Sequence, residues 1–148
     1  MGQCRQIKGD ILVIDAKGNT NRAVAGDFVM QLAQGVGVQG FVVDGVIRDL
    51  AAARAIDFPV FALGTTVAAV NKYGGGVVGL PVSIGDVVVE TGDYIIGDID
   101  GVIVVPQNQV EAIIEAAESK VAKDEAREQE ALHNGEESIR AYLAKVVK

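Results

Sequence analysis

The stretch GDFVMQLAQGVGVQGFVVDGVIRD, residues 26–49, decides the fold. Its first half predicts a helix, because apolar residues recur at intervals of three and four and two glycines then end the pattern. The expected inward face consists of Phe28, Val29, Leu32, Ala33 and Val36. The apolar run Phe41 to Val43, followed by Asp44-Gly45, predicts a short buried strand and a turn. Together these features are typical of a parallel strand, helix and strand unit.

The two ends of this stretch are expected to meet at one edge of the sheet. In such a unit the helix begins at the edge where the following strand ends. Asp27 should therefore lie near Arg48 and Asp49, although residues 28–47 separate Asp27 from Arg48. Open sheets bind ligands outside the carboxyl ends of their strands, so this edge is the candidate site.

The groups at this edge suit a small anion held together with a divalent metal ion. The backbone amides of residues 27–30 should lack partners within the helix, and the helix dipole adds to their attraction for a carboxylate or phosphate. Arg48 could bind a second oxygen, and Asp49 could hold Mg²⁺ through one carboxylate. The predicted substrate-binding residues are Gly26, Asp27, Phe28, Val29, Met30 and Arg48. The residues alone leave an alternative open, in which Asp27 only caps the helix and Arg48 with Asp49 is a solvated pair.

The sequence also resembles a known family. Asp27, twenty intervening residues and then Arg48-Asp49 match the D-x20-R-D motif of the 4-hydroxy-4-methyl-2-oxoglutarate aldolases, a family that includes the regulator of ribonuclease E activity A. Further similar segments occur in family order: GDILVIDAKG at residues 9–18, GFVVDGVIRDL at 40–50, FPVFALGTT at 58–66 and GDYIIGDIDGVIVVP at 92–106. The resemblance implies a swivelling β/β/α domain.

The resemblance implies a divalent-metal-dependent lyase that releases pyruvate from 4-hydroxy-2-oxo diacids, with oxaloacetate decarboxylation as a side activity. Asp49 would hold Mg²⁺ or Mn²⁺, which the 2-oxo acid chelates through its carbonyl and one carboxylate oxygen. Arg48 would stabilise charge near the carbonyl. Asp27 would orient or deprotonate a metal-bound water that acts as base. The family also implies a homotrimer or hexamer with sites between subunits.

Two departures from the family pattern bear on activity. Relatives generally carry a segment ahead of the first strand that supplies acidic residues to a neighbouring subunit's site, and none is assigned here. Ala52 stands where an acid is often found three residues after the Asp. The alternative function is a non-catalytic interaction protein like the ribonuclease E regulators. Retention of Asp49 favours the aldolase, because an inhibitory surface has no evident need for a metal ligand beside an Arg.

The remainder of the first 106 residues predicts an α/β core domain. A strand over Ile11 to Ile14 leads into a polar loop, Lys17 to Arg22, in which a solvated Arg22 is favoured over a substrate ligand. A short helix and a strand follow at residues 50–56 and 59–63. Short β-branched runs at 77–82, 87–89, 94–96 and 102–105 predict a compact β layer.

Residues 107–148 predict helices packed on the core or on a neighbouring subunit. The expected inward faces are formed by Val110, Ile113, Ile114, Ala117 and Val121, and by Ile139, Tyr142, Leu143 and Val146.

Composition excludes several classes of protein. A net charge of −7 argues against non-specific binding to nucleic acid, because no basic surface is available for phosphates. The single cysteine, Cys4, excludes an intrachain disulfide and fits a reducing compartment. The chain opens with polar residues and has no apolar run long enough to span a bilayer. We therefore expect a soluble cytoplasmic protein with no membrane partner.

Overall fold

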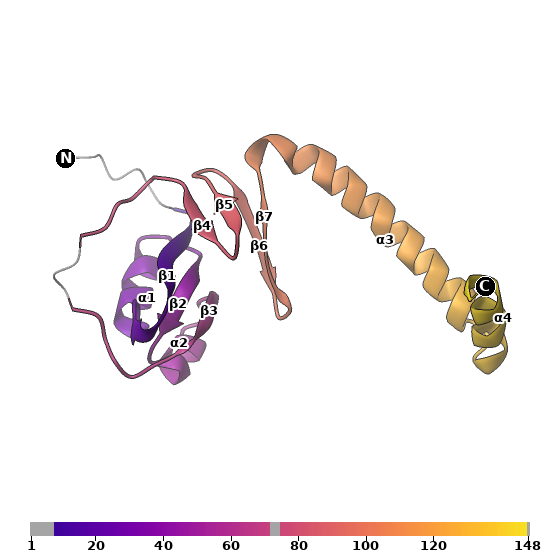
Figure 1. Ribbon diagram of the computed structural model, residues 1–148, viewed down its shortest axis with the longest axis horizontal. Helices are drawn as coiled ribbons and strands as arrows, with labels where there is room; N and C mark the ends of the chain where they lie inside the picture. Colours follow the sequence, from indigo (N-terminus) through magenta and orange to yellow (C-terminus); the bar gives the residue numbers. More distant parts are fainter. Residues whose placement is uncertain (1–7, 72–74, 148) are drawn as a thin grey trace. The chain divides into compact units, whose positions relative to one another are not determined.

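The computed structural model describes residues 8–71 and 75–147. The chain divides into two compact units with the boundary after Pro106. The first unit contains β1 (Ile11–Ala23), α1 (Asp27–Gly35), β2 (Gly40–Ile47), α2 (Leu50–Ala55), β3 (Val60–Thr65), β4 (Val82–Ile84), β5 (Val87–Val89), β6 (Tyr94–Asp98) and β7 (Gly101–Val105). The second contains a short 3-10 helix η1 (Gln107–Gln109), α3 (Val110–Leu132) and α4 (Glu136–Val146) (Figure 1).

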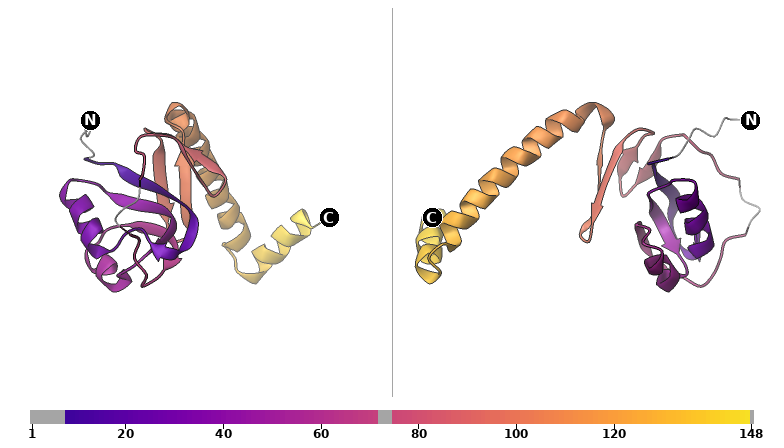
Figure 2. Two further views of the ribbon diagram at one scale, coloured as in Figure 1. Left: turned by 60° about the vertical axis from the view of Figure 1, so that its left-hand side comes forward. Right: turned by 180° about the vertical axis from the view of Figure 1, so that it is seen from behind.

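The first unit is built on a parallel sheet with strand order β1-β2-β3. Helices α1 and α2 cover one face, and the antiparallel hairpins β4-β5 and β6-β7 lie on the other (Figure 2). The core lies between the sheet and the helices, where the rings of Phe41 and Phe58 meet edge to face at 4.9 Å. Its other buried members are Ala25, Met30, Val38, Val43, Ile47 and Ala53. The predicted α/β fold with a C-terminal helical extension is confirmed.

Strand lengths differ from the predictions. Strand β1 continues past Ile14 through the predicted loop to Ala23, with register shifts on either side of Asn19. Strand β2 likewise passes through Asp44-Gly45, where a turn was predicted, to Ile47. The predicted strand at residues 77–82 is wrong for all but its last residue, because β4 begins at Val82. Hydrogen bonding to a neighbouring strand therefore sets where these strands begin and end. It can continue a strand through polar residues, and an apolar segment without such a partner is not a strand.

The predicted inward face of the first helix is wrong except at Ala33, which packs against the core. Met30 is completely buried, whereas Phe28, Leu32 and Val36 are 67%, 56% and 62% exposed. The residues at intervals of four thus form an outer surface of α1. The physical reason is that Met30 points into the core beside Phe41 and Val43, which fixes the rotation of the helix.

The second unit is a hairpin of two helices. Buried Ser138 at the start of α4 lies with Oγ 2.9 Å from the carbonyl oxygen of Ala131 and accepts a hydrogen bond from the Asn134 amide at 3.2 Å. Lys145 Nζ donates to Glu130 Oε1 at 2.7 Å, which joins α4 to α3. No residue of α3 is buried, so its predicted apolar face is uncovered. What this unit packs on stays a prediction.

Within the described part of the chain, no helix combines the length and the apolar character needed to cross a lipid bilayer.

Candidate functional site

The start of α1 and the exit of β2 meet at Gly26. This buried residue directly precedes α1, and a Cβ atom placed on it would overlap Asp49 Oδ2 and come within 2.8 Å of Arg48 Nε. The backbone fastens the two segments together, since the amide of Arg48 donates to the carbonyl of Ala25 at 2.9 Å. The convergence expected from the parallel unit is therefore present, at the carboxyl edge of the sheet.

Arg48 and Asp49 form a partly exposed pair at this edge. The guanidinium Nε lies 3.2 Å from Asp49 Oδ2, and the two side chains are 45% and 39% exposed. Asp49 has left-handed backbone angles, φ 60° and ψ 39°, which Asp and Asn adopt more readily than most residues. Its carbonyl accepts the first hydrogen bond of α2, from the Ala53 amide at 2.9 Å. Both charged groups are thus held by ordered backbone and remain open to a ligand.

The amides at the start of α1 are less available than the sequence indicates. The Phe28 amide donates to Asp27 Oδ1 at 2.7 Å, and the Met30 amide donates to the Gly26 carbonyl at 3.1 Å. The expectation that all four amides lack partners is wrong for these two, because the Asp27 carboxylate and the residue before the helix satisfy them. The amides of Asp27 and Val29 have no hydrogen-bond partner among the described residues. Two donors therefore remain for an anion.

The carboxylates at this edge suit Mg²⁺ better than Zn²⁺. Among residues 8–71 and 75–147, no three His, Cys, Asp or Glu side chains are grouped so that they could hold a metal. A closed zinc site of four protein ligands is therefore absent from this described part. Mg²⁺ commonly takes one or two protein carboxylates and completes its shell with water and substrate oxygens. The exposed Asp49 carboxylate beside a helix N-terminus suits that arrangement.

A network of hydrogen bonds anchors the neighbouring segments. The Gly18 amide donates to Asp44 Oδ2 at 3.0 Å, which ties the irregular part of β1 to β2. Asp15 pairs with Lys17, and the ammonium group of Lys17 holds the pKa of the Asp15 carboxyl below its ordinary value. Sequence reasoning missed Asp44 as an anchor, although its position in a predicted Asp-Gly turn marked it as a polar group able to bond backbone.

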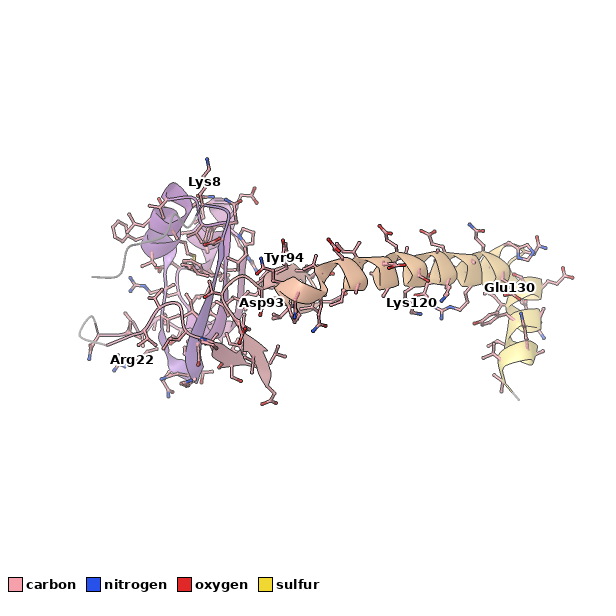
Figure 3. All side chains as sticks on the ribbon, turned by 90° about the horizontal axis from the view of Figure 1, so that it is seen from above. Lys8, Arg22, Asp93, Tyr94, Lys120 and Glu130 are labelled. Carbon is pink, nitrogen blue, oxygen red and sulfur yellow. The ribbon has the colours of Figure 1, made fainter. Side chains whose placement is uncertain are left out.

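Arg22 is also an anchor rather than a solvated side chain. Its Nη1 donates to the Ala69 carbonyl at 2.9 Å. Two backbone bonds join the same segments, from the Ala23 amide to Ala68 at 2.7 Å and from the Val70 amide to Ala23 at 3.3 Å. These three hydrogen bonds hold residues 68–70 against the end of β1. Figure 3 shows Arg22 at the opposite end of the unit from Lys8.

Comparison with known proteins identifies the family. A family model described as RraA-like, Aldolase/RraA, matches residues 4–104. The chain belongs to this family. A protein of Halalkalibacterium halodurans, provisionally named a 4-hydroxy-4-methyl-2-oxoglutarate aldolase, is 50% identical over 139 residues. That match covers 94% of this chain and 66% of the relative, so the chain spans slightly less than two thirds of the relative's length. The family predicted from D-x20-R-D is confirmed.

Solved structures agree with this assignment. An uncharacterized protein from Pseudomonas syringae pv. tomato is similar with a TM-score of 0.78 and 27% identity, over 90% of this chain and 67% of that one. The structure of the RNA-processing inhibitor RraA from Thermus thermophilis is similar with a TM-score of 0.66 and 29% identity, over 70% of this chain and 63% of that one. The predicted fold class is therefore that of the family.

Proposed function

We propose that the protein is a divalent-metal-dependent lyase that cleaves 4-hydroxy-2-oxo diacids, such as 4-hydroxy-4-methyl-2-oxoglutarate, to pyruvate and a second 2-oxo acid. The observation that carries the proposal is the contact of Arg48 and Asp49 with Gly26 at the start of α1. This contact gathers a cation, a carboxylate and unpaired helix amides on one exposed edge. The name of the relative from Halalkalibacterium halodurans supports the same reaction.

Each residue of the edge has a distinct role in this proposal. The amides of Asp27 and Val29 bind the substrate carboxylate, assisted by the positive end of the helix dipole. Asp27 takes the proton of the 4-hydroxyl group through a water molecule, and the bond between C3 and C4 breaks as the hydroxyl-bearing carbon becomes a carbonyl. The electron pair of that bond enters the pyruvate fragment as an enolate, whose oxygen Arg48 stabilises. Protonation at C3 then gives pyruvate.

Asp49 is proposed to hold Mg²⁺ or Mn²⁺. A divalent ion bound there supplies Lewis-acid polarisation of the substrate's 2-oxo group. Loss of carbon dioxide from oxaloacetate leaves the same pyruvate enolate, so oxaloacetate decarboxylation is a side activity of the proposed site. We further propose that copies of the chain assemble as a homotrimer or hexamer, the arrangement that the family resemblance implies.

The test is pyruvate release from 4-hydroxy-4-methyl-2-oxoglutarate with Mg²⁺ and with excess EDTA. We expect metal-dependent release by the native protein and a decrease of at least about 100-fold in Asp49→Asn, because the cation loses its charged ligand. Asn keeps the left-handed backbone accessible. The matched control is Asp86→Asn, another left-handed Asp with φ 64°, in the β4-β5 turn. Absence of metal-dependent release by the native protein would contradict the proposal.

A second candidate function is a non-catalytic regulator. It is favoured by the similarity to the RNA-processing inhibitor from Thermus thermophilis and by the exposed apolar surface on α1, which could contact another protein. The two candidates differ at Asp49. A regulator that binds through α1 would lose function in Leu32→Glu and keep it in Asp49→Asn, whereas the aldolase would lose activity in Asp49→Asn.

A further inference from the structure

We propose that Asn134 is a site of spontaneous covalent modification, in which its side-chain amide is lost and the backbone between Asn134 and Gly135 is rebuilt through an imide ring. Asn134-Gly135 is the single Asn-Gly pair of the sequence. It lies in the turn that joins α3 to α4 (Figure 1). The site is contained within the second unit and is independent of the lyase reaction.

The modification needs only water. The backbone nitrogen of Gly135 loses its proton to solvent base and attacks Cγ of Asn134, so that a C–N bond forms and ammonia leaves with a proton from solvent. Water then opens the five-membered imide at either of its two carbonyl carbons. Opening at the side-chain carbonyl carbon gives aspartate, and opening at the backbone carbonyl carbon gives iso-aspartate. The net change is the exchange of ammonia for water.

The Gly135 nitrogen is open to attack on the side chain that precedes it. Gly135 has no Cβ beside this nitrogen, and an added Cβ would meet nothing within 4 Å. Its N–H donates to the Leu132 carbonyl at 3.3 Å, which is longer than the usual distance for an amide donor. The other four asparagines are followed by Thr, Lys, Arg or Gln, each with a Cβ next to the corresponding nitrogen. The steric barrier to ring closure is therefore lowest at Asn134.

The Asn134 side chain is free to reach that nitrogen. The residue is exposed, and its carboxamide has no hydrogen-bond partner among the residues that the structure describes. The N-cap of α4 is Gly135, and no side chain caps the helix there. By contrast, the carboxamide oxygen of Asn19 accepts a hydrogen bond from the Asn21 amide at 2.8 Å. Rotation of the Asn134 side chain can therefore bring Cγ to the Gly135 nitrogen without the loss of a hydrogen bond.

The two products differ in their effect on the hairpin of helices. Aspartate keeps the course of the main chain and changes only the end of an exposed side chain. Iso-aspartate inserts a methylene group into the main chain of the turn. The turn is held by buried Ser138, whose Oγ accepts from the Asn134 amide at 3.2 Å and lies 2.9 and 3.0 Å from the Ala131 and Gly135 carbonyl oxygens. Iso-aspartate should therefore loosen α4 from α3, whereas aspartate should not.

Incubation of the native chain in isotopically labelled water at mildly alkaline pH tests the site. After digestion in ordinary water, peptide mass spectrometry should find the oxygen label at residue 134 ahead of Asn19, Asn21 and Asn108. The rate should increase with pH, because the attacking nitrogen must lose its proton. The matched control is Asn134→Gln, which keeps the amide but would have to close a six-membered ring, and residue 134 should stay unlabelled in it. No label at Asn134, or equal labelling of the other asparagines, would overturn the proposal.

Detection of iso-aspartate provides the second arm. Its carboxylate is methylated enzymatically with a labelled methyl donor, and helix content is measured by circular dichroism. We expect methylation of the aged native chain at residue 134, with a loss of helix content that follows the methylated fraction. Fresh Asn134→Asp should be unmethylated and keep the native helix content. Oxygen label at residue 134 without methylation, or full helix content in the methylated chain, would overturn the proposed change in the backbone of the turn.

Discussion

Gly26 determines how closely the helix start approaches the Arg48-Asp49 pair. A Gly26→Ala substitution adds a methyl group where Asp49 Oδ2 and Arg48 Nε now lie, so both side chains must move. The backbone of Gly26, with φ −138°, is accessible to Ala, so we expect a small change in melting temperature. Displacement of the charged groups by about 1 Å should reduce kcat/KM about 100-fold. Steady-state kinetics and a thermal melt measure the two effects.

The control is Gly35→Ala at the other end of α1. A Cβ atom there meets nothing within 4 Å, and Ala should stabilise the helix by about 0.5 to 1 kcal/mol while leaving kcat/KM unchanged. Native activity in Gly26→Ala would show that the close approach at Gly26 has no part in the chemistry.

Lys17 controls the ionisation of Asp15. Because the ammonium group lowers the pKa of Asp15 in the folded protein, this pair stabilises the fold above the carboxyl's unfolded pKa, and the stabilisation is lost as pH falls through the folded pKa. Replacing Lys17 by Met should raise the Asp15 pKa toward its ordinary value. An NMR titration of the Asp15 carboxyl measures the shift. An unchanged Asp15 pKa in Lys17→Met would show that the Lys17 ammonium group does not lower it.

Among the elements, α1 shows what periodicity can and cannot predict. The spacing of Phe28, Leu32 and Val36 correctly predicts a helix, which spans Asp27–Gly35. Spacing does not show which apolar residues face the core, because Met30 and Ala33 also lie on one side of the same helix. The convergence of its start with Arg48 was predictable, since it follows from the handedness and direction of parallel units. The pairing of the Phe28 and Met30 amides was not, because it depends on the rotamer of Asp27 and the backbone at Gly26.

Strand β1 shows a different limit of prediction from sequence. Its polar residues 17–22 predict a loop, yet they continue the strand because Asn19 and Ala23 pair with β2 and Gly18 bonds Asp44. Such pairing is set by partners distant in the sequence, which local composition does not reveal.

Arg22 holds this part of β1 to residues 68–70. Replacing Arg22 by Met should remove the bond to the Ala69 carbonyl and lower the free energy of unfolding by about 1 kcal/mol. Hydrogen exchange at the Val70 amide, which donates to Ala23, should accelerate. The control is Arg54→Met, because Arg54 is exposed on α2 and has no hydrogen bond or ion pair among the described residues. Equal rates of hydrogen exchange at the Val70 amide in Arg22→Met and in the native protein would show that Arg22 does not hold this segment.

At the scale of the whole molecule, each of the two units leaves an apolar helical surface exposed. The proposed assembly of copies stabilises the folded chain, so the melting temperature should rise with protein concentration. We expect this rise in the native protein, measured by calorimetry over a 100-fold concentration range. A melting temperature independent of concentration in the native protein would count against the assembly.

The most direct test of the central claim, that a divalent ion and a 2-oxo acid bind together at the start of α1, is calorimetric titration with pyruvate. We expect binding in the presence of Mg²⁺, no detectable binding with EDTA, and no detectable Mg²⁺-dependent binding in Asp49→Asn. Pyruvate binding of equal affinity with EDTA, or in Asp49→Asn, would contradict the claim.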